Sequence, residues 1–260
     1  MKSFIKQYWK TLLFFGIIGL VGGFFVGIYL LDSYPAEIQK QLIAELAEQG
    51  LGDIPVNIAL GAITASQALF YGIVLGALGI WLAKKVGLWK DERSFTKKPL
   101  LASALVSVFG GSVMILSDVL FFGSFSEVIK SSYAVKPTIP YLAATVTYGA
   151  VIEEIMLRLF TMSLTAFVLH RLFQKNKELP SDSILIIANI LSALLFAAGH
   201  LPATVTTIGS SPIIILRCFL LNGGIGLLFG RLYRKYGLRY AMIAHGGCHI
   251  ISKLIWILFL

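Results

Sequence analysis

The sequence predicts an all-α fold, a polytopic membrane bundle of about seven transmembrane helices. The chain of 260 residues is 57% hydrophobic and only 13% charged, whereas soluble domains have about 25% charged residues. Its mean hydropathy is +0.82, and seven segments carry the roughly 20 apolar residues that cross a bilayer. Backbone polar groups in lipid must be satisfied within each segment, so the spans are expected to be helical.

The predicted spans are, in chain order, roughly 11–31, 55–83, 99–122, 139–170, 183–203, 211–233 and 239–259. The first is longer than the roughly 7–15 apolar residues of a signal peptide and lacks an A-x-A cleavage site, which favours an uncleaved span. The chain has no internal repeat, low-complexity tract or long linker. A single membrane-embedded domain over 1–260 is therefore expected.

Charge in the connecting segments predicts the orientation. Basic residues cluster before the first span and after the second, fourth and sixth: Lys2, Lys6, Lys10; Lys84, Lys85, Lys90, Arg93, Lys97, Lys98; Arg171, Lys175, Lys177; Arg231, Arg234, Lys235, Arg239. The other loops lack this excess, and 32–54 carries five acids against Lys40. The positive-inside rule then places the N-terminus in the cytoplasm and the C-terminus outside. The outer segment AEIQKQLIAELAEQGLG has one apolar face and is expected to form a short interfacial helix.

The fourth span carries Glu153, Glu154 and Arg158 at a depth where each ionised side chain costs at least ~2.5–3.5 kcal/mol. Glu154 and Arg158 are spaced i, i+4 with the acid first, the favourable order for an ion pair. Neighbouring residues point about 100° apart on a helix, so Glu153 lies on another face without a partner in its own helix. Glu154 is therefore assigned a structural role, and Glu153 needs a partner on another helix.

Histidines supply such partners from two later spans. Phe196 precedes His200 by one helical turn in the fifth span, and His245 and His249 share one face of the seventh. A carboxylate with an imidazole can remove a proton from water, and further donors can stabilise the oxyanion formed when water attacks an amide. Peptide hydrolysis is one chemistry that this set supports. Zinc binding is a rival, because three histidines and a glutamate are possible ligands, although the HExxH spacing of zinc proteases is absent.

The segments EEIMLR, FAAGH and HGGCH together resemble the motifs of the CPBP family, the CAAX prenyl proteases and bacteriocin-processing proteins also called the Abi family. The resemblance covers roughly 140–255, with His249 where an Asn is common. It implies an intramembrane endopeptidase, of the glutamic type and without a catalytic metal or other cofactor. Glu153 and His200 would activate water, and His245 with His249 would bind the developing oxyanion. Glu154, Arg158 and Phe196 would support the site.

The site poses a geometric problem if helices start where the loops end. Counting ~1.5 Å per residue, His245 lies ~9 Å and His200 ~25 Å from the cytoplasmic edge. Tilt, a later start of the fifth span, or non-helical backbone in 201–210 around Pro202 would bring them together. The cavity is expected to open to the cytoplasm, so that the peptide is cut near the cytoplasmic face.

Two other function classes remain open. One is a non-catalytic immunity or membrane-assembly protein that uses the same helices as a scaffold, and the other is a proton-coupled transporter. Expected partners are membrane lipids and a peptide or protein substrate, which can be lipidated. Nucleic-acid binding is not expected, because the basic residues lie at topology-setting positions. The predicted location is a bacterial plasma membrane.

Overall fold

The computed structural model describes residues 2–90 and 94–260, and within them every regular element is helical; Arg93, one of the residues used to predict orientation, lies outside this part. The elements are, in chain order, α1 (Lys2–Ser33), α2 (Ala36–Glu48), α3 (Val56–Phe70), η1 (Tyr71–Leu75), α4 (Gly76–Lys85), α5 (Lys97–Leu120), η2 (Phe122–Phe125), α6 (Glu127–Ser132), α7 (Ile139–Ala144), η3 (Thr145–Glu153), η4 (Ile155–Met162), α8 (Ser163–Phe173), α9 (Asp182–Thr207), α10 (Pro212–Cys218), η5 (Phe219–Gly224), α11 (Ile225–Tyr236) and α12 (Leu238–Phe259).

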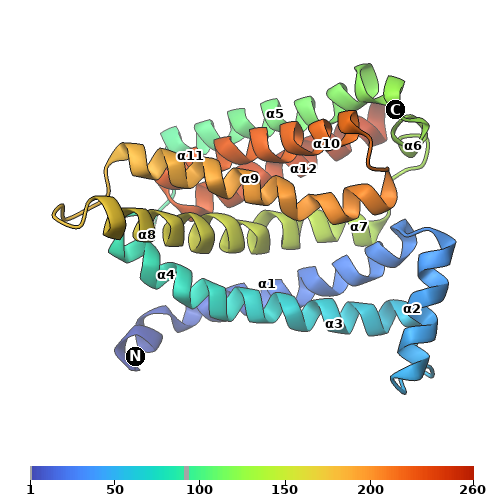
Figure 1. The fold of residues 1–260 in the computed structure, drawn as a ribbon, viewed down its shortest axis with the longest axis horizontal. Coiled ribbons are helices and arrows are strands. Elements are labelled where there is room, and N and C mark those ends of the chain that lie inside the picture. The colour runs from blue at the N-terminus through green and yellow to red at the C-terminus, as the bar shows by residue number, and fades with distance from the viewer. Residues whose placement is uncertain (1, 91–93) are drawn as a thin grey trace.

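The predicted fold class is confirmed. Within the described residues, six helices are long and apolar enough to cross a membrane: Ser3–Ser33, Val56–Lys85, Lys97–Phe125, Asp182–Thr207, Pro212–Tyr236 and Leu238–Phe259. The remaining predicted span, 139–170, corresponds to the unbroken helical run α7–η3–η4–α8, which carries the three charged residues. The expected interfacial helix is present as α2, which lies across one end of the bundle (Figure 1).

The run α7–α8 lies between two groups of helices (Figure 1). On one side α1 packs against α3, and on the other lie α5, α9, α10, α11 and α12. The N-terminus and the ends of α4, α8 and α11 lie at one end of the bundle, which we call the basic end. The C-terminus, α2 and α6 lie at the opposite end.

Small residues allow α1 and α3 to approach closely. Gly19, Gly23 and Gly27 recur every four residues on α1, and a Cβ at any of them would collide with the backbone of α3. The Thr64 hydroxyl on α3 donates to the Gly23 carbonyl at 2.6 Å, which ties the helices together at this contact. Such contacts replace hydrophobic burial, which provides no driving force between helices in lipid.

The helices between the two groups depart from the expected α geometry. The segments η3 and η4 are π-helical on both sides of Glu154, and the Thr161 hydroxyl donates to the carbonyl five residues before it, that of Met156, at 2.7 Å. A shorter π segment, η5, interrupts the sixth span. Wide helical turns of this kind occur frequently at functional sites, and here they surround the unpaired glutamate.

Candidate active site

A cavity of about 590 Å³ occupies the half of the bundle away from the basic end. Its walls come from α1, α5, η3, α9, α10–α11 and α12, and it extends from Glu153, His200 and His245 to residues at the far helix ends, including Ser33, Thr207 and Trp256. Phe229 in its wall also belongs to a buried apolar cluster that includes Ile155, Leu159, Met162 and Tyr233. This placement contradicts the expectation that the cavity opens on the same side as the N-terminus.

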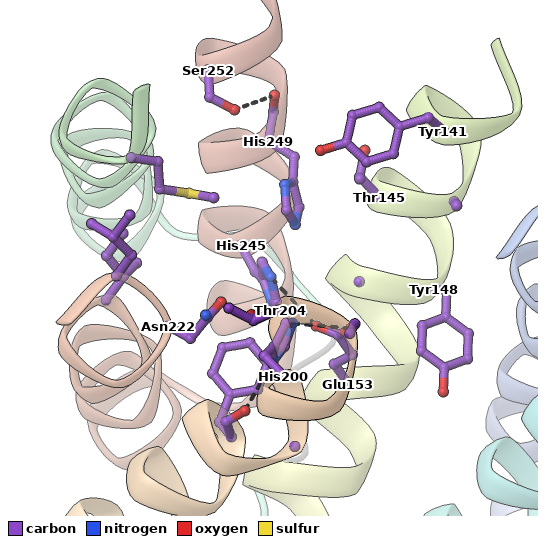
Figure 2. Close-up of a pocket in the computed structure, with 18 of the residues that line it drawn as sticks. Tyr141, Thr145, Tyr148, Glu153, His200, Thr204, Asn222, His245, His249 and Ser252 are labelled. Atoms are coloured by element: carbon purple, nitrogen blue, oxygen red, sulfur yellow. Dashed lines mark hydrogen bonds and ion pairs between the residues drawn. The ribbon is translucent and has the colours of Figure 1, made fainter. Parts of the chain in front are cut away.

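Glu153 is the residue on which the site converges (Figure 2). It is the last residue of η3, and its carboxylate is one-fifth exposed within the cavity. One carboxylate oxygen lies 4.0 Å from His200 Nε2 and the other 3.8 Å from His245 Nε2. The partners expected from two other helices are thus in place.

The other ring nitrogen of each histidine fixes which atoms face Glu153. His200 Nδ1 lies 2.9 Å from the Phe196 carbonyl, which only accepts, so Nδ1 carries the proton. His245 Nδ1 lies 2.9 Å from Glu154 Oε1 and donates to that carboxylate. In both neutral rings the unprotonated Nε2 therefore faces Glu153. The separations of about 4 Å exceed a direct hydrogen bond but suit a water that contacts carboxylate and imidazole together.

Glu154 and Arg158 form the expected ion pair, with Oε1 and Nη1 3.1 Å apart and both side chains almost fully buried. Arg158 Nη2 also donates to the Gly226 carbonyl at 2.9 Å, and its guanidinium lies over the rings of Phe196 and Phe229. The pair therefore neutralises charge within the bilayer, as its spacing predicts. Its contact with His245 is a second role, because the Glu154 carboxylate also sets the orientation of that ring.

Aromatic rings hold the imidazoles in position. The Phe196 ring contacts His200 edge-on at 4.7 Å between centroids, and it lies 5.7 Å from His245. His245 stacks on Phe229 with 4.5 Å between ring centroids and on His249 with 5.0 Å. Phe196 has its expected supporting place, whereas Phe229 is a member of the site that no motif indicated.

His249 reaches the cavity because the facing residue is a glycine. A Cβ at Gly149 would lie 3.1 Å from His249 Nε2 and 3.9 Å from the Glu153 carboxylate. His249 Nδ1 is buried and, among the described residues, has no hydrogen-bond partner. A neutral His249 protonated on Nε2 would direct its one donor at the space beside Glu153. Gly149 lies one turn before Glu153, and that spacing was its only sequence signal.

His200 and His245 lie at the same level in the structure, although counting residues from the cytoplasmic edge places them at different depths. α9 continues through Pro202 to Thr207, so non-helical backbone in 201–210, one of the three ways considered to bring the residues together, does not apply to most of that segment. The Phe196 ring on α9 lies 5.7 Å from His245 on α12, and Glu153 lies about 4 Å from both His200 and His245. A helix of 26 residues is longer than the hydrocarbon requires, which leaves room for its own tilt.

Farther along the cavity, Arg217 forms a bidentate ion pair with Asp118, and the Tyr133 hydroxyl donates to the same carboxylate at 2.7 Å. Burial, followed by the charge of Asp118, raises the pKa of the Tyr133 hydroxyl, so it remains a donor. Arg217 is therefore the counter-ion of Asp118. Among the described residues, no group of three or more His, Cys, Asp or Glu is arranged to hold a metal ion, and the metal-free mechanism stays a prediction.

Residues 135–251 match the family model described as type II CAAX prenyl endopeptidase Rce1-like. The matched segment contains all the motif residues and ends within α12. Searches of curated proteins and of solved structures found no match. The match confirms the resemblance to the CAAX proteases and indicates that the chain is a protease. Over residues 135–251, this chain is similar to the Rce1-like type II CAAX prenyl endopeptidases.

Proposed function

We propose that the protein is an intramembrane endopeptidase in which Glu153 and His200 activate the attacking water. The observation that carries this proposal is the convergence of Glu153 with the unprotonated Nε2 atoms of His200 and His245 inside a cavity. The Glu153 carboxylate and the His200 imidazole are 4.0 Å apart, so one water molecule can contact both. Such a water is held in a fixed position for proton removal and for attack on the substrate, which suits general-base catalysis.

The proposed reaction balances without another reactant. The water oxygen attacks the carbonyl carbon of the scissile amide while one water proton passes to Glu153. The resulting tetrahedral oxyanion accepts a hydrogen bond from His249 Nε2, and from His245 only when that ring is an imidazolium, because neutral His245 uses its single proton on Glu154. Glu153 then gives its proton to the amide nitrogen, the C–N bond breaks, and an amine and a carboxylic acid leave.

The cavity favours a substrate that enters from the extracytoplasmic side. The cavity-lining residues lie in the half of the bundle away from the basic end, and that end is cytoplasmic by the positive-inside rule. Cleavage near the cytoplasmic face would require the chain to insert against its own charge bias. The proposed substrate is therefore a peptide or membrane-attached segment presented on the outer side of the membrane.

A peptide library incubated with the purified protein in ¹⁸O-labelled water tests the proposed reaction. Hydrolysis predicts product pairs in which the new carboxyl terminus carries one ¹⁸O atom, detected by mass spectrometry. The native protein should retain activity after chelation and contain no stoichiometric zinc by elemental analysis. Zinc at one atom per chain, with activity lost on chelation, would replace this mechanism with the metal-dependent one. No cleavage across the library would favour a non-catalytic scaffold.

A further inference from the structure

Lys253 is a buried cation of the cavity for which the fold provides no acidic partner. It lies on α12 one turn beyond His249, lines the cavity and is only 7% exposed. Among the described residues, no carboxylate lies within ion-pair distance of its ammonium, and Nζ lies over the ring of Tyr141, 4.6 Å from the ring centroid. A lysine near the end of a span often extends its head to the water interface, but this one is held inside the protein.

The other charged side chains that line the cavity each have a partner within the protein. Arg217 is held by Asp118 in a bidentate pair, and Glu153 faces the two imidazoles. The cavity therefore has a carboxylate at its inner end and an uncompensated ammonium toward its outer end. A buried charge without a partner destabilises the folded protein. Lys253 therefore needs a negatively charged partner that the described residues do not provide.

We propose that Lys253 binds a carboxylate of the substrate and so determines which way the peptide lies in the cavity. A carboxylate is attracted to Lys253 and repelled by Glu153, which orients the carboxyl-terminal side of the scissile bond toward the outer end. The inference rests on the proposed function in taking the ligand to be a peptide, and its register also takes the scissile bond to face Glu153. The bound carboxylate belongs either to the chain terminus or to an acidic side chain.

The position of Lys253 also sets the register. His245 and Lys253 are eight residues apart on one helix, which is about 12 Å along its axis. An extended peptide advances about 3.3–3.6 Å per residue. A carboxylate held by Lys253 therefore lies about three or four residues beyond the bond that faces Glu153.

Binding measurements on the Glu153→Gln protein test this assignment, because that variant keeps bound peptide intact. The probes are a fluorescein-labelled hexapeptide of alanine and leucine with a free carboxyl terminus, the same peptide as a terminal amide, and the amide with one aspartate near its end. Fluorescence anisotropy should show the acid binding about tenfold more tightly than the amide, the size expected of a charge-assisted contact. Recovery of affinity by the aspartate peptide would assign the side chain as an accepted source.

Second substitutions separate a binding role from a structural one. Lys253→Met should abolish the difference between acid and amide without lowering thermal stability, because a flexible apolar chain replaces a buried charge. Lys253→Arg should retain the difference. Arg217→Met, the matched control, should lower stability while leaving the preference in place, since it strips Asp118 of its partner.

Equal binding of acid and amide, including binding of neither, or a preference that survives in Lys253→Met, would overturn the assignment. The proposed hydrolysis is tested separately by cleavage in the native protein. Failure of that reaction with an intact Lys253-dependent preference would leave a peptide-binding scaffold, so the two results are distinguishable.

Discussion

At the scale of single residues, two adjacent glutamates do different work because neighbouring positions on a helix face different surroundings. Glu154 is fully buried against Arg158 and His245, whereas Glu153 faces the cavity. The i, i+4 spacing predicted the first pair, and the lack of such a partner singled out Glu153. The spacing of the charged residues along the sequence thus already distinguishes the two side chains.

Contacts between helices at the site were beyond prediction from spacing. The Glu154–His245 hydrogen bond, the stacking of His245 on Phe229 and the burial of Lys253 depend on how each helix is rotated about its axis. Positions i and i+4 define a face, but they do not say which neighbour that face meets. The π segments also change the direction in which side chains point around the helix axis. A face assigned from α-helical spacing would therefore be turned away from its true neighbours.

Glu154→Gln is expected to destabilise the protein as well as reduce activity. The change leaves Arg158 as a buried charge without its partner, a loss of roughly 3–5 kcal/mol for buried pairs. It also removes the carboxylate that orients His245. Thermal unfolding in detergent should show a clear drop in Tm. A Tm equal to that of the native protein would contradict the structural role assigned to this pair.

Gly149→Ala should lower activity while preserving the fold. Its added methyl group would lie 3.1 Å from His249 Nε2, which is close enough to displace the ring from the space beside Glu153. Gly199→Ala is the matched control, because a Cβ there meets nothing within 4 Å although the residue also lines the cavity. Cleavage rates and Tm should be compared for both. Unchanged cleavage in Gly149→Ala would remove His249 from the proposed oxyanion site.

At the scale of secondary-structure elements, hydropathy located the spans but not their internal geometry. The predicted segments coincide with helices, whose ends lie up to nine residues beyond the predicted limits, as α1 begins at Lys2 and not at residue 11. Polar residues at helix ends are compatible with the interface, so an apolar count underestimates length. An apolar pattern also does not distinguish π from α turns. The continuation of α9 through Pro202 escaped prediction because neighbouring helices and side chains can satisfy the freed backbone groups.

Gly23→Leu is expected to separate α1 from α3. The side chain would enter the backbone of α3 at Thr64 and Ala65 and break the hydrogen bond from Thr64. Gly224→Leu provides a control, since that glycine is exposed and its Cβ would meet nothing within 4 Å. Thermal unfolding and limited proteolysis should show a loss of stability for Gly23→Leu alone. Equal stability of the two variants would show that close packing of α1 on α3 is dispensable.

At the scale of the whole molecule, the distribution of charge and the position of the cavity together define a sidedness. Basic residues gather at one end of the bundle, and the cavity occupies the other half. The sequence predicted the first of these facts. The sequence did not predict the position of the cavity. That position depends on which halves of the helices diverge, and the residue pattern does not indicate this.

Thiol labelling tests the sidedness in intact bacterial cells that express the protein. The substitutions Ser33→Cys and Thr207→Cys place a thiol in the outer part of the cavity. Lys175→Cys places one in the basic segment after α8. A membrane-impermeant maleimide should label the first two cysteines in intact cells and the third only after lysis. The native Cys218 and Cys248 are buried, and the unsubstituted protein gives the background. Labelling in the reverse pattern would place the cavity on the cytoplasmic side.

The most direct test of the whole account is the single-turnover cleavage rate of Glu153→Gln, measured together with its Tm on a peptide that the native protein cuts. Removal of a general base is expected to slow cleavage by at least 10²–10⁴-fold. The Tm should stay at the native value, because Glu153 forms no ion pair within the folded helix and glutamine fills the same space. A Glu153→Gln protein that folds normally and cleaves at the native rate would contradict the assignment of Glu153 as the base that activates water.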